Sequence, residues 1–378
     1  MSSRYNVKKA SSMLNKENDG AMNVLKKAQV PLAKIVLDKR PALKQSKSIV
    51  ISQPLETSSV EKEKTKVVKD KEDALVEIKK EERKREATKF RRSETEKVVA
   101  AYGKTWISDM KSKEKNTWPK APLANHKISA NVRAKMIDWM IEVLCSYKCT
   151  DMTFFVAVNY MDMYFQKTTI KHELNDLHLI GVSSMYVATK YEEISPLRIS
   201  VMHSKISHGK FSKEDIRNKE FDILEALNFE CSPITILNFL ELALETIKLR
   251  DVLSDALYAH LVKLSIYIAK MIMHEYELLS KYSQSEFAVA CIYIALKIIQ
   301  QLEPTFKIET YAYRLRVAFD VSENDFFECS QNCLDLAKGF ETKYPSLTNL
   351  AKFHSFSVDL TCNASDVQMA EQDTNENA

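Results

Sequence analysis

The stretch SMYVATKYEEISP, Ser184 to Pro196, has the pattern of a buried helix that ends at a proline. Its segment MYVATK, Met185 to Lys190, returns 107 residues later as IYIALK, Ile292 to Lys297, and a proline follows each copy at a similar offset. A six-residue match between helices can arise by chance, but the shared proline offset favours duplication. We therefore predict an all-α fold built from two similar helical units in tandem.

Helical periodicity continues on both sides of this repeat. β-branched alternation never persists over a whole segment, and Pro196, Pro233, Pro304 and Pro345 fall at starts and breaks. We expect one preceding helix and then five helices in each unit. The predicted helices cover residues 94–113, 130–146, 152–166, 175–191, 196–204, 213–227, 234–248, 252–274, 285–300, 305–314 and 324–340.

Charge and composition divide the chain. Residues 1–93 have few aromatics and many charged and polar residues, so we expect a disordered tail. The folded units should occupy 94–232 and 233–350, before a flexible acidic tail at 351–378. Residues 1–100 hold 25 Lys and Arg against 15 Asp and Glu, a net +10, which leaves −6 for the other 278 residues. A folded part without excess basic charge argues against a nucleic-acid partner.

Composition also excludes several classes of protein. Only 5 glycines occur and no glycine-rich loop is present, which argues against a nucleotide-binding enzyme. The 7 cysteines are scattered and lack histidines at zinc-finger spacing, so we expect reduced thiols and no metal. No stretch approaches the ~18 uninterrupted apolar residues of a membrane span. We expect no catalytic residue, no cofactor and no membrane partner.

Two charged residues, Lys190 and Glu220, stand where helical spacing calls for apolar residues. Lys190 continues the stripe of Tyr186 and Val187, and Glu220 lies on the stripe that begins at Ile216. A buried charge without a partner costs several kcal/mol, so these two should lie near each other or near a partner protein. A lysine at a helix C-terminus also suits the helix dipole, and spacing alone leaves that alternative open.

A second pair follows the same pattern. Arg133 shares an apolar stripe with Met140, and Asp162 shares one with Phe165. We predict a structural salt bridge between Arg133 and Asp162, joining the first two helices of the first unit.

Four segments follow one another along the first unit: NVRAKMIDWMIEV (131–143), VNYMDMYF (158–165), ATKYEEISP (188–196) and KEFDILEALNFECSP (219–233). In this order they resemble the cyclin box of mitotic A/B-type cyclins, with the B type favoured. The likeness covers about residues 94–350. In the second unit, YSQSEFAVACIYIALK, residues 282–297, resembles the C-terminal cyclin fold of the same family.

This resemblance implies a regulatory subunit that binds and activates a cyclin-dependent kinase in mitosis and does no chemistry itself. In the family, the residues matching Lys190 and Glu220 form a charged pair against the regulatory helix of the kinase. We therefore expect Lys190 and Glu220 at the centre of the kinase interface. Apolar contact around them would come from Tyr191, Ile223 and Leu224.

The resemblance also implies a substrate-docking patch on the first helix of the box, which would recognise Arg-x-Leu motifs. Glu142 would meet the arginine. Lys135 stands where the family has an apolar residue and would repel a basic motif. A purely structural role for Met136 and Trp139 in the core stays open. The apolar floor of the patch would consist of Val132, Met136, Trp139 and Leu177.

The N-terminal tail holds two words that resemble degrons. Lys16, Glu17 and Asn18 form a KEN word of the kind read by the anaphase-promoting complex, and Arg40 to Leu43 has the Arg-x-x-Leu core of a destruction box. An extended tail can be captured by such a receptor, which predicts ubiquitin-dependent destruction. We expect the protein in the nucleus and the cytoplasm.

Two other classes remain. A general transcription factor with tandem cyclin folds would carry a zinc ribbon and a basic helical domain, and neither is present in the sequence. A helical scaffold that activates no kinase would have Lys190 and Glu220 as ordinary surface charges.

Overall fold

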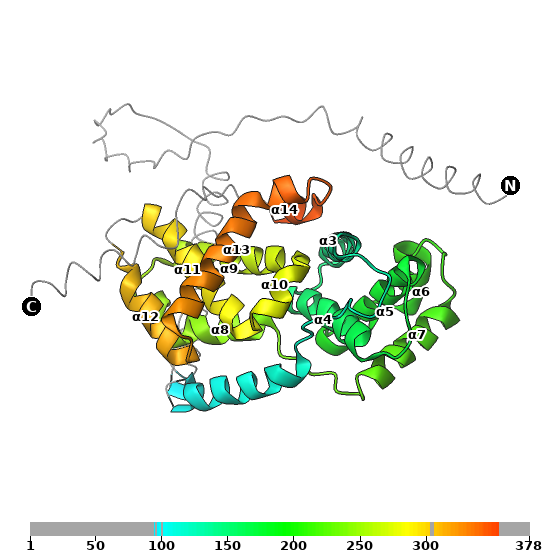
Figure 1. Ribbon diagram of the computed structural model, residues 1–378, viewed down its shortest axis with the longest axis horizontal. Coiled ribbons are helices and arrows are strands. Elements are labelled where there is room, and N and C mark those ends of the chain that lie inside the picture. The colour runs from blue at the N-terminus through cyan, green and yellow to red at the C-terminus, as the bar shows by residue number, and fades with distance from the viewer. Residues whose placement is uncertain (1–93, 95–96, 100, 303–305, 355–378) are drawn as a thin grey trace, which may run out of the picture. The chain divides into compact units, whose positions relative to one another are not determined.

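The computed structural model describes residues 94, 97–99, 101–302 and 306–354 (Figure 1). The degron-like words and most of the predicted acidic tail lie outside these residues. Every regular element in the described part is a helix, and the single β-bridge there joins Lys127 and Glu173. The predicted all-α class is confirmed, with two helical bundles in tandem behind a preceding helix at residues 101–117.

The first bundle is built around α4, in which every residue from Thr153 to Phe165 is buried. The prediction of one regular helix over residues 196–204 is wrong. The helix begins only at Ile199, and Ser207 donates its N–H to the Met202 carbonyl across a π-helical turn. The elements are α3 (Ala130–Ser146), α4 (Asp151–Lys167), α5 (Leu174–Glu192), α6 (Ile199–Val201), η2 (Met202–Ile206) and α7 (Lys213–Ala226).

The second bundle is built around α11, which packs against α8, α9, α12 and α13. Two short helices, α10 and α14, were not predicted, and α14 crosses the boundary expected at residue 350. By length and composition α9 could span a membrane, yet it packs against α11, α13 and α3 as a core helix. The elements are α8 (Ile236–Ile247), η3 (Leu249–Asp251), α9 (Asp255–His274), α10 (Tyr276–Lys281), α11 (Gln284–Leu302), α12 (Ile308–Phe319), α13 (Glu323–Lys343) and α14 (Asn349–Phe353).

Side-chain caps explain why many helix boundaries could be read from the sequence. In the described part, a Ser or Thr hydroxyl accepts a hydrogen bond from a first-turn N–H at seven helix starts, which satisfies a donor that has no partner inside the helix. Such a cap fixes the start of a helix to within a residue. The capping residues are Ser129, Thr150, Ser212, Thr235, Ser254, Ser283 and Ser322.

The preceding helix is fastened to the second bundle. The Trp118 indole N–H lies 3.2 Å from the carbonyls of both Leu279 and Tyr282. Glu114 accepts hydrogen bonds from the backbone and hydroxyl of Ser285, at 3.0 Å each. Glu114 is only 4% exposed at this joint, and its burial raises its pKa.

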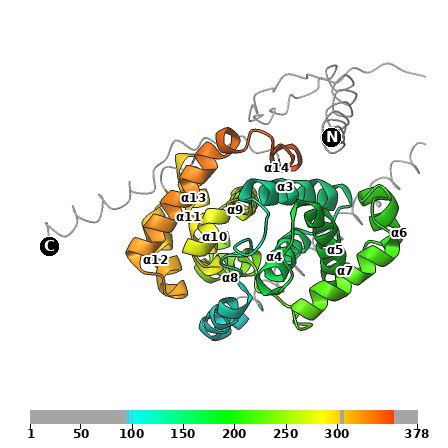
Figure 2. The same cartoon turned by 45° about the vertical axis from the view of Figure 1, so that its right-hand side comes forward.

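At its other end the chain returns to the first bundle. Both views place α14 beside α3 (Figure 2). The Asp138 carboxylate on α3 accepts from the backbone N–H groups of Asn349 and Leu350, at 3.3 and 3.2 Å, and so caps α14. The two bundles are therefore joined by α14 as well as by the chain between them.

Candidate protein-binding site

Lys190, at the end of α5, and Glu220, in the middle of α7, form an ion pair although they lie thirty positions apart. The Lys190 side chain is 39% exposed and that of Glu220 is 13% exposed. The Lys190 ammonium also lies 4.6 Å from the centre of the Tyr186 ring. Partial burial lowers the pKa of Lys190. The two charges predicted to converge therefore do so at the surface of the first bundle.

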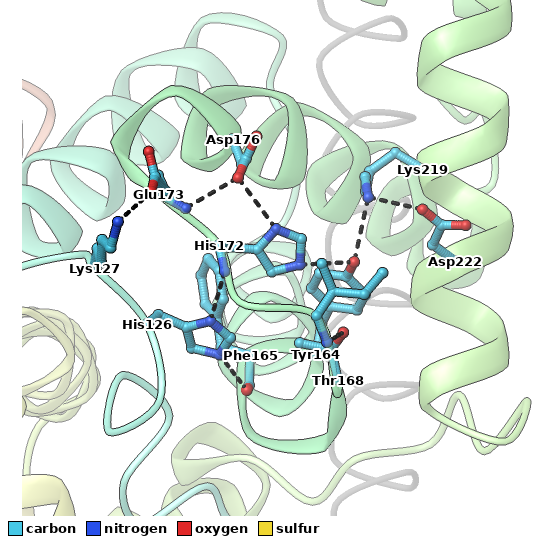
Figure 3. Close-up of polar contacts among 11 residues, drawn as sticks. His126, Lys127, Tyr164, Phe165, Thr168, His172, Glu173, Asp176, Lys219 and Asp222 are labelled. Carbon is cyan, nitrogen blue, oxygen red and sulfur yellow. Dashed lines mark hydrogen bonds and ion pairs between the residues drawn. The ribbon is translucent and has the colours of Figure 1, made fainter.

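A polar network surrounds Lys219, the residue before Glu220 on α7 (Figure 3). Its neighbour Lys219 donates to Asp222 at 2.7 Å and to the Tyr164 hydroxyl at 3.2 Å. The same hydroxyl lies 3.1 Å from Nε2 of His172, in the loop before α5. These bonds tie α7 to α4 and to the start of α5, so Glu220 meets Lys190 at a fixed place.

The two glutamates that follow Lys190 have different roles. Glu193 Oε1 accepts from the Thr150 N–H and the Thr153 hydroxyl, both at 2.6 Å, and so caps the start of α4. Glu192 is half-buried, and burial, with Glu193 beside it, raises its pKa. Glu193 therefore stabilises the fold, whereas Glu192 is a partly desolvated carboxylate two residues after Lys190.

Large apolar side chains are exposed at residues that lie close to this pair in the sequence. Ile194 is fully exposed at 102%, and Phe221 and Phe229 are 55% and 61% exposed with ring centres 6.4 Å apart. Phe229 has φ +57°, a left-handed conformation that is rare for a bulky residue. We call this surface the ion-pair face. It consists of Lys190, Tyr191, Ile194, Glu220, Phe221, Leu224 and Phe229.

One predicted contact residue is wrong. Ile223 has no exposed surface, because it lies on the core stripe of α7 with Ile216 and Leu227. It packs inside the first bundle and cannot contact a partner. Leu224, one position on, is half-buried at the edge of the core. Ile194, Phe221 and Phe229 were not predicted, although each is an apolar residue that lies outside the core stripe.

Arg133 and Asp162 form a salt bridge with both side chains buried. Arg133 donates to the two carboxylate oxygens at 2.8 and 2.5 Å. Its Nη1 also donates to the Met273 carbonyl of α9 at 2.9 Å. This pair therefore lies in the joint between the bundles and not on a binding surface.

The residues predicted to dock substrates divide into two groups. Val132, Met136 and Trp139 are half-buried on the outer side of α3, and Lys135 is exposed beside them. Leu177 was predicted as part of the floor, but it is only 2% exposed and packs in the core below. The half-buried residues can contact another molecule, whereas Leu177 cannot.

Glycine allows α3 and α5 to approach closely under this patch. A Cβ at Gly181 would lie 2.6 Å from the sulfur of Met136. Glu142, predicted to meet an arginine, already contacts α14. Its carboxylate accepts from Asn349 at 3.4 Å and lies 3.9 Å from the Lys352 ammonium.

Family models match both bundles. The cyclin N-terminal domain matches residues 105–232, and the cyclin C-terminal domain matches residues 234–366. The viral cyclin of herpesvirus saimiri has the same fold, with a TM-score of 0.53 at 16% identity over 65% of this chain and 98% of that one.

Plant cyclins are similar in sequence. Cyclin-A1-4 of rice is 32% identical over 47% of this chain and 48% of its own length, and putative cyclin-A3-1 of Arabidopsis thaliana is 30% identical over 52% and 53%. The G2/mitotic-specific cyclin C13-1 of carrot is 33% identical over 30% of this chain and 32% of its own. The chain spans about half the length of the first two relatives. These relatives fit a mitotic A/B-type cyclin, and the preference for the B type stays a prediction. With both cyclin domains matched in tandem, the chain belongs to the cyclin family.

Proposed function

We propose that this cyclin is the regulatory subunit of a cyclin-dependent kinase, which it binds through the ion-pair face and activates in mitosis. The observation that carries this proposal is the Lys190–Glu220 pair, which is partly desolvated and has exposed aromatic and aliphatic residues next to it in the sequence. Protein interfaces draw most of their affinity from such a centre once the surrounding contacts exclude water.

Activation would follow from differential binding. The face would hold the kinase's regulatory helix turned inward, so that the glutamate of that helix reaches the kinase's catalytic lysine. The cyclin shifts the kinase towards this state only by binding it more tightly than the inactive state. The cyclin contributes surface and charge, and the kinase carries out the phosphoryl transfer.

Capture of a cyclin-dependent kinase and histone phosphorylation test this proposal. Lys190→Ala should abolish both, and the charge swap Lys190→Glu with Glu220→Lys should restore the internal pair without restoring capture. Lys127→Ala is a matched control, because it removes the lysine of an exposed ion pair with Glu173 at the other end of α5. Capture by the swapped protein at wild-type level would mean that the pair is only structural, as expected of a helical scaffold that activates no kinase.

A transcription factor is the other alternative. That reading predicts binding to duplex DNA, although the excess basic charge of this chain lies in residues 1–100 and the remainder carries net −6. A salt-dependent shift of labelled DNA by residues 94–378, without kinase capture, would favour it.

The patch on α3 would select substrates for the bound kinase. Its half-buried apolar residues can hold the side chain of a docking motif, and the family resemblance implies an Arg-x-Leu core. Trp139→Ala should slow phosphorylation of a docked substrate while leaving that of a short peptide substrate unchanged.

Destruction would depend on the N-terminal tail. The anaphase-promoting complex would read Lys16, Glu17 and Asn18 together with the word from Arg40 to Leu43. Removal of residues 1–93 should lengthen the protein's lifetime in mitotic extract without reducing kinase activation. Equal lifetimes would contradict the degron assignment. Imaging of a tagged chain would test the proposed presence in nucleus and cytoplasm.

A further inference from the structure

A small aromatic surface lies on the outer side of α3. Trp139 and His178 of α5 meet edge to face with ring centres 5.1 Å apart, and His178 meets Phe211 in the same way, also at 5.1 Å. All three are half-buried, so their rings are both supported from below and accessible. We call this surface, with Val132 and Met136, the docking patch.

Two lysines flank the docking patch. Lys135 is exposed four residues before Trp139, which puts it one turn away on the same helix. Lys210 lies 3.4 Å from Nδ1 of His178 and 5.2 Å from the centre of the Phe211 ring. In the described part of the chain neither lysine forms an ion pair with a carboxylate.

His178 adds a neutral hydrogen-bond donor to the patch. Burial, together with the nearby charges of Lys210 and His208, lowers its pKa to about 4. The ring is therefore neutral at physiological pH. When Lys210 donates to Nδ1, the ring proton lies on Nε2, where it can be donated to an acceptor on a ligand.

The carboxylate that could attract a basic motif is Glu142, one turn beyond Trp139 on the side away from Lys135. This carboxylate already accepts a hydrogen bond from Asn349 and lies 3.9 Å from the Lys352 ammonium of α14. An arginine beside Trp139 would compete with these two residues for Glu142, and Lys135 and Lys210 would repel it.

We propose that the docking patch binds a protein segment whose apolar side chain is flanked by Asp or Glu, and not by Arg. The apolar side chain would pack against Trp139, and the carboxylate would lie between Lys135 and Lys210. This inference rests on the proposed role of the patch in substrate selection and changes the chemistry of the motif that it selects.

The test uses the full-length chain without kinase and four fluorescent peptides that share a Leu-x-Leu core. Their flanks carry Asp, Asn, Arg or phosphoserine, and binding is followed by fluorescence anisotropy. The Asp peptide should bind about fivefold more tightly than the Arg peptide at 0.15 M salt, from two exposed charge contacts of the usual strength. At 1 M salt this difference should shrink, because the charges are screened.

Three variants locate the effect. Lys135→Glu with Lys210→Glu should reverse the order of the Asp and Arg peptides. Lys263→Glu with Lys281→Glu makes the same change of net charge at exposed positions of the second bundle and should leave the order unchanged. Trp139→Ala should weaken both peptides, with circular dichroism checking its fold.

Equal or tighter binding of the Arg peptide would overturn the proposal, and so would binding of no peptide or of the phosphoserine peptide alone. Binding of the Asp peptide only after removal of residues 355–378 would mean that these residues of the same chain occupy the patch instead. Kinase capture by the Lys135→Glu/Lys210→Glu variant is measured separately, as a test of the kinase-binding proposal. Its loss would count against the kinase-binding proposal, and a reversed peptide order would still support this one.

Discussion

Arg133 on α3 and Asp162 on α4 are joined by two hydrogen bonds, at 2.8 and 2.5 Å, where neither side chain reaches solvent. A third donor of the guanidinium binds the Met273 carbonyl on α9, at 2.9 Å. One ion pair therefore connects three helices from both bundles. A buried pair of this kind contributes less by its attraction than by the cost of leaving either partner alone.

Asp162→Ala should lower the free energy of unfolding by about 3–5 kcal/mol, because Arg133 would stay buried with only one carbonyl as partner. Urea unfolding followed by circular dichroism measures this loss. Asp109→Ala removes an exposed pair with Lys113 and should cost less than about 1 kcal/mol. Similar losses in the two variants would contradict the assigned role of the buried pair.

Phe229→Gly should affect stability and binding in opposite directions. Glycine adopts a positive φ without the strain of a bulky side chain, so the free energy of unfolding should rise by up to about 1 kcal/mol. The variant should capture less kinase, because an exposed ring of the ion-pair face is lost. Asn228→Gly is the control, since Asn228 has φ +53° and asparagine tolerates that conformation. A Phe229→Gly protein that is less stable and binds fully would refute both parts.

Substitution of the neighbouring glutamates Glu192 and Glu193 should have different effects on the free energy of unfolding. Glu193→Ala leaves the Thr150 N–H and the Thr153 hydroxyl without their acceptor, and should cost about 1–2 kcal/mol in thermal or urea unfolding. Glu192→Ala removes a half-buried carboxylate whose pKa burial has raised, so it should cost little or nothing. The reverse order of the two losses would show that the cap is not at Glu193.

Much of the fold could be predicted because the caps and prolines mark helix ends locally. The helix predicted at residues 130–146 has the same range as α3, and Ser129 caps its start. The helices that were missed, α10 and α14, are 6 and 5 residues long and are held by tertiary contacts such as that of Asp138 with α14. Elements that short leave almost no periodic signal.

The binding site could be predicted less fully. The pairing of Lys190 with Glu220 followed from charges on apolar stripes, because burying them apart would be costly. The contact role that the family resemblance implied for Ile223 was wrong, because Ile223 lies on the buried stripe of α7 with Ile216 and Leu227. The exposed Phe229 depends on a left-handed backbone after α7, which no local pattern of apolar residues predicts.

His274 on α9 should make the protein sensitive to acid. Burial lowers the pKa of this fully buried ring to about 4, against about 6.5 when unfolded, so the unfolded chain binds the extra proton first. Stability should be complete above pH 6.5 and fall by about 2.5 kcal/mol by pH 4.5 through this group alone. His274→Gln should therefore lose less stability between pH 7 and pH 4.5 than the wild type, in urea unfolding at both values. His260→Gln, at a half-buried position of the same helix, should keep the wild-type loss. Equal losses in all three proteins would show that His274 takes up no proton on unfolding in this range.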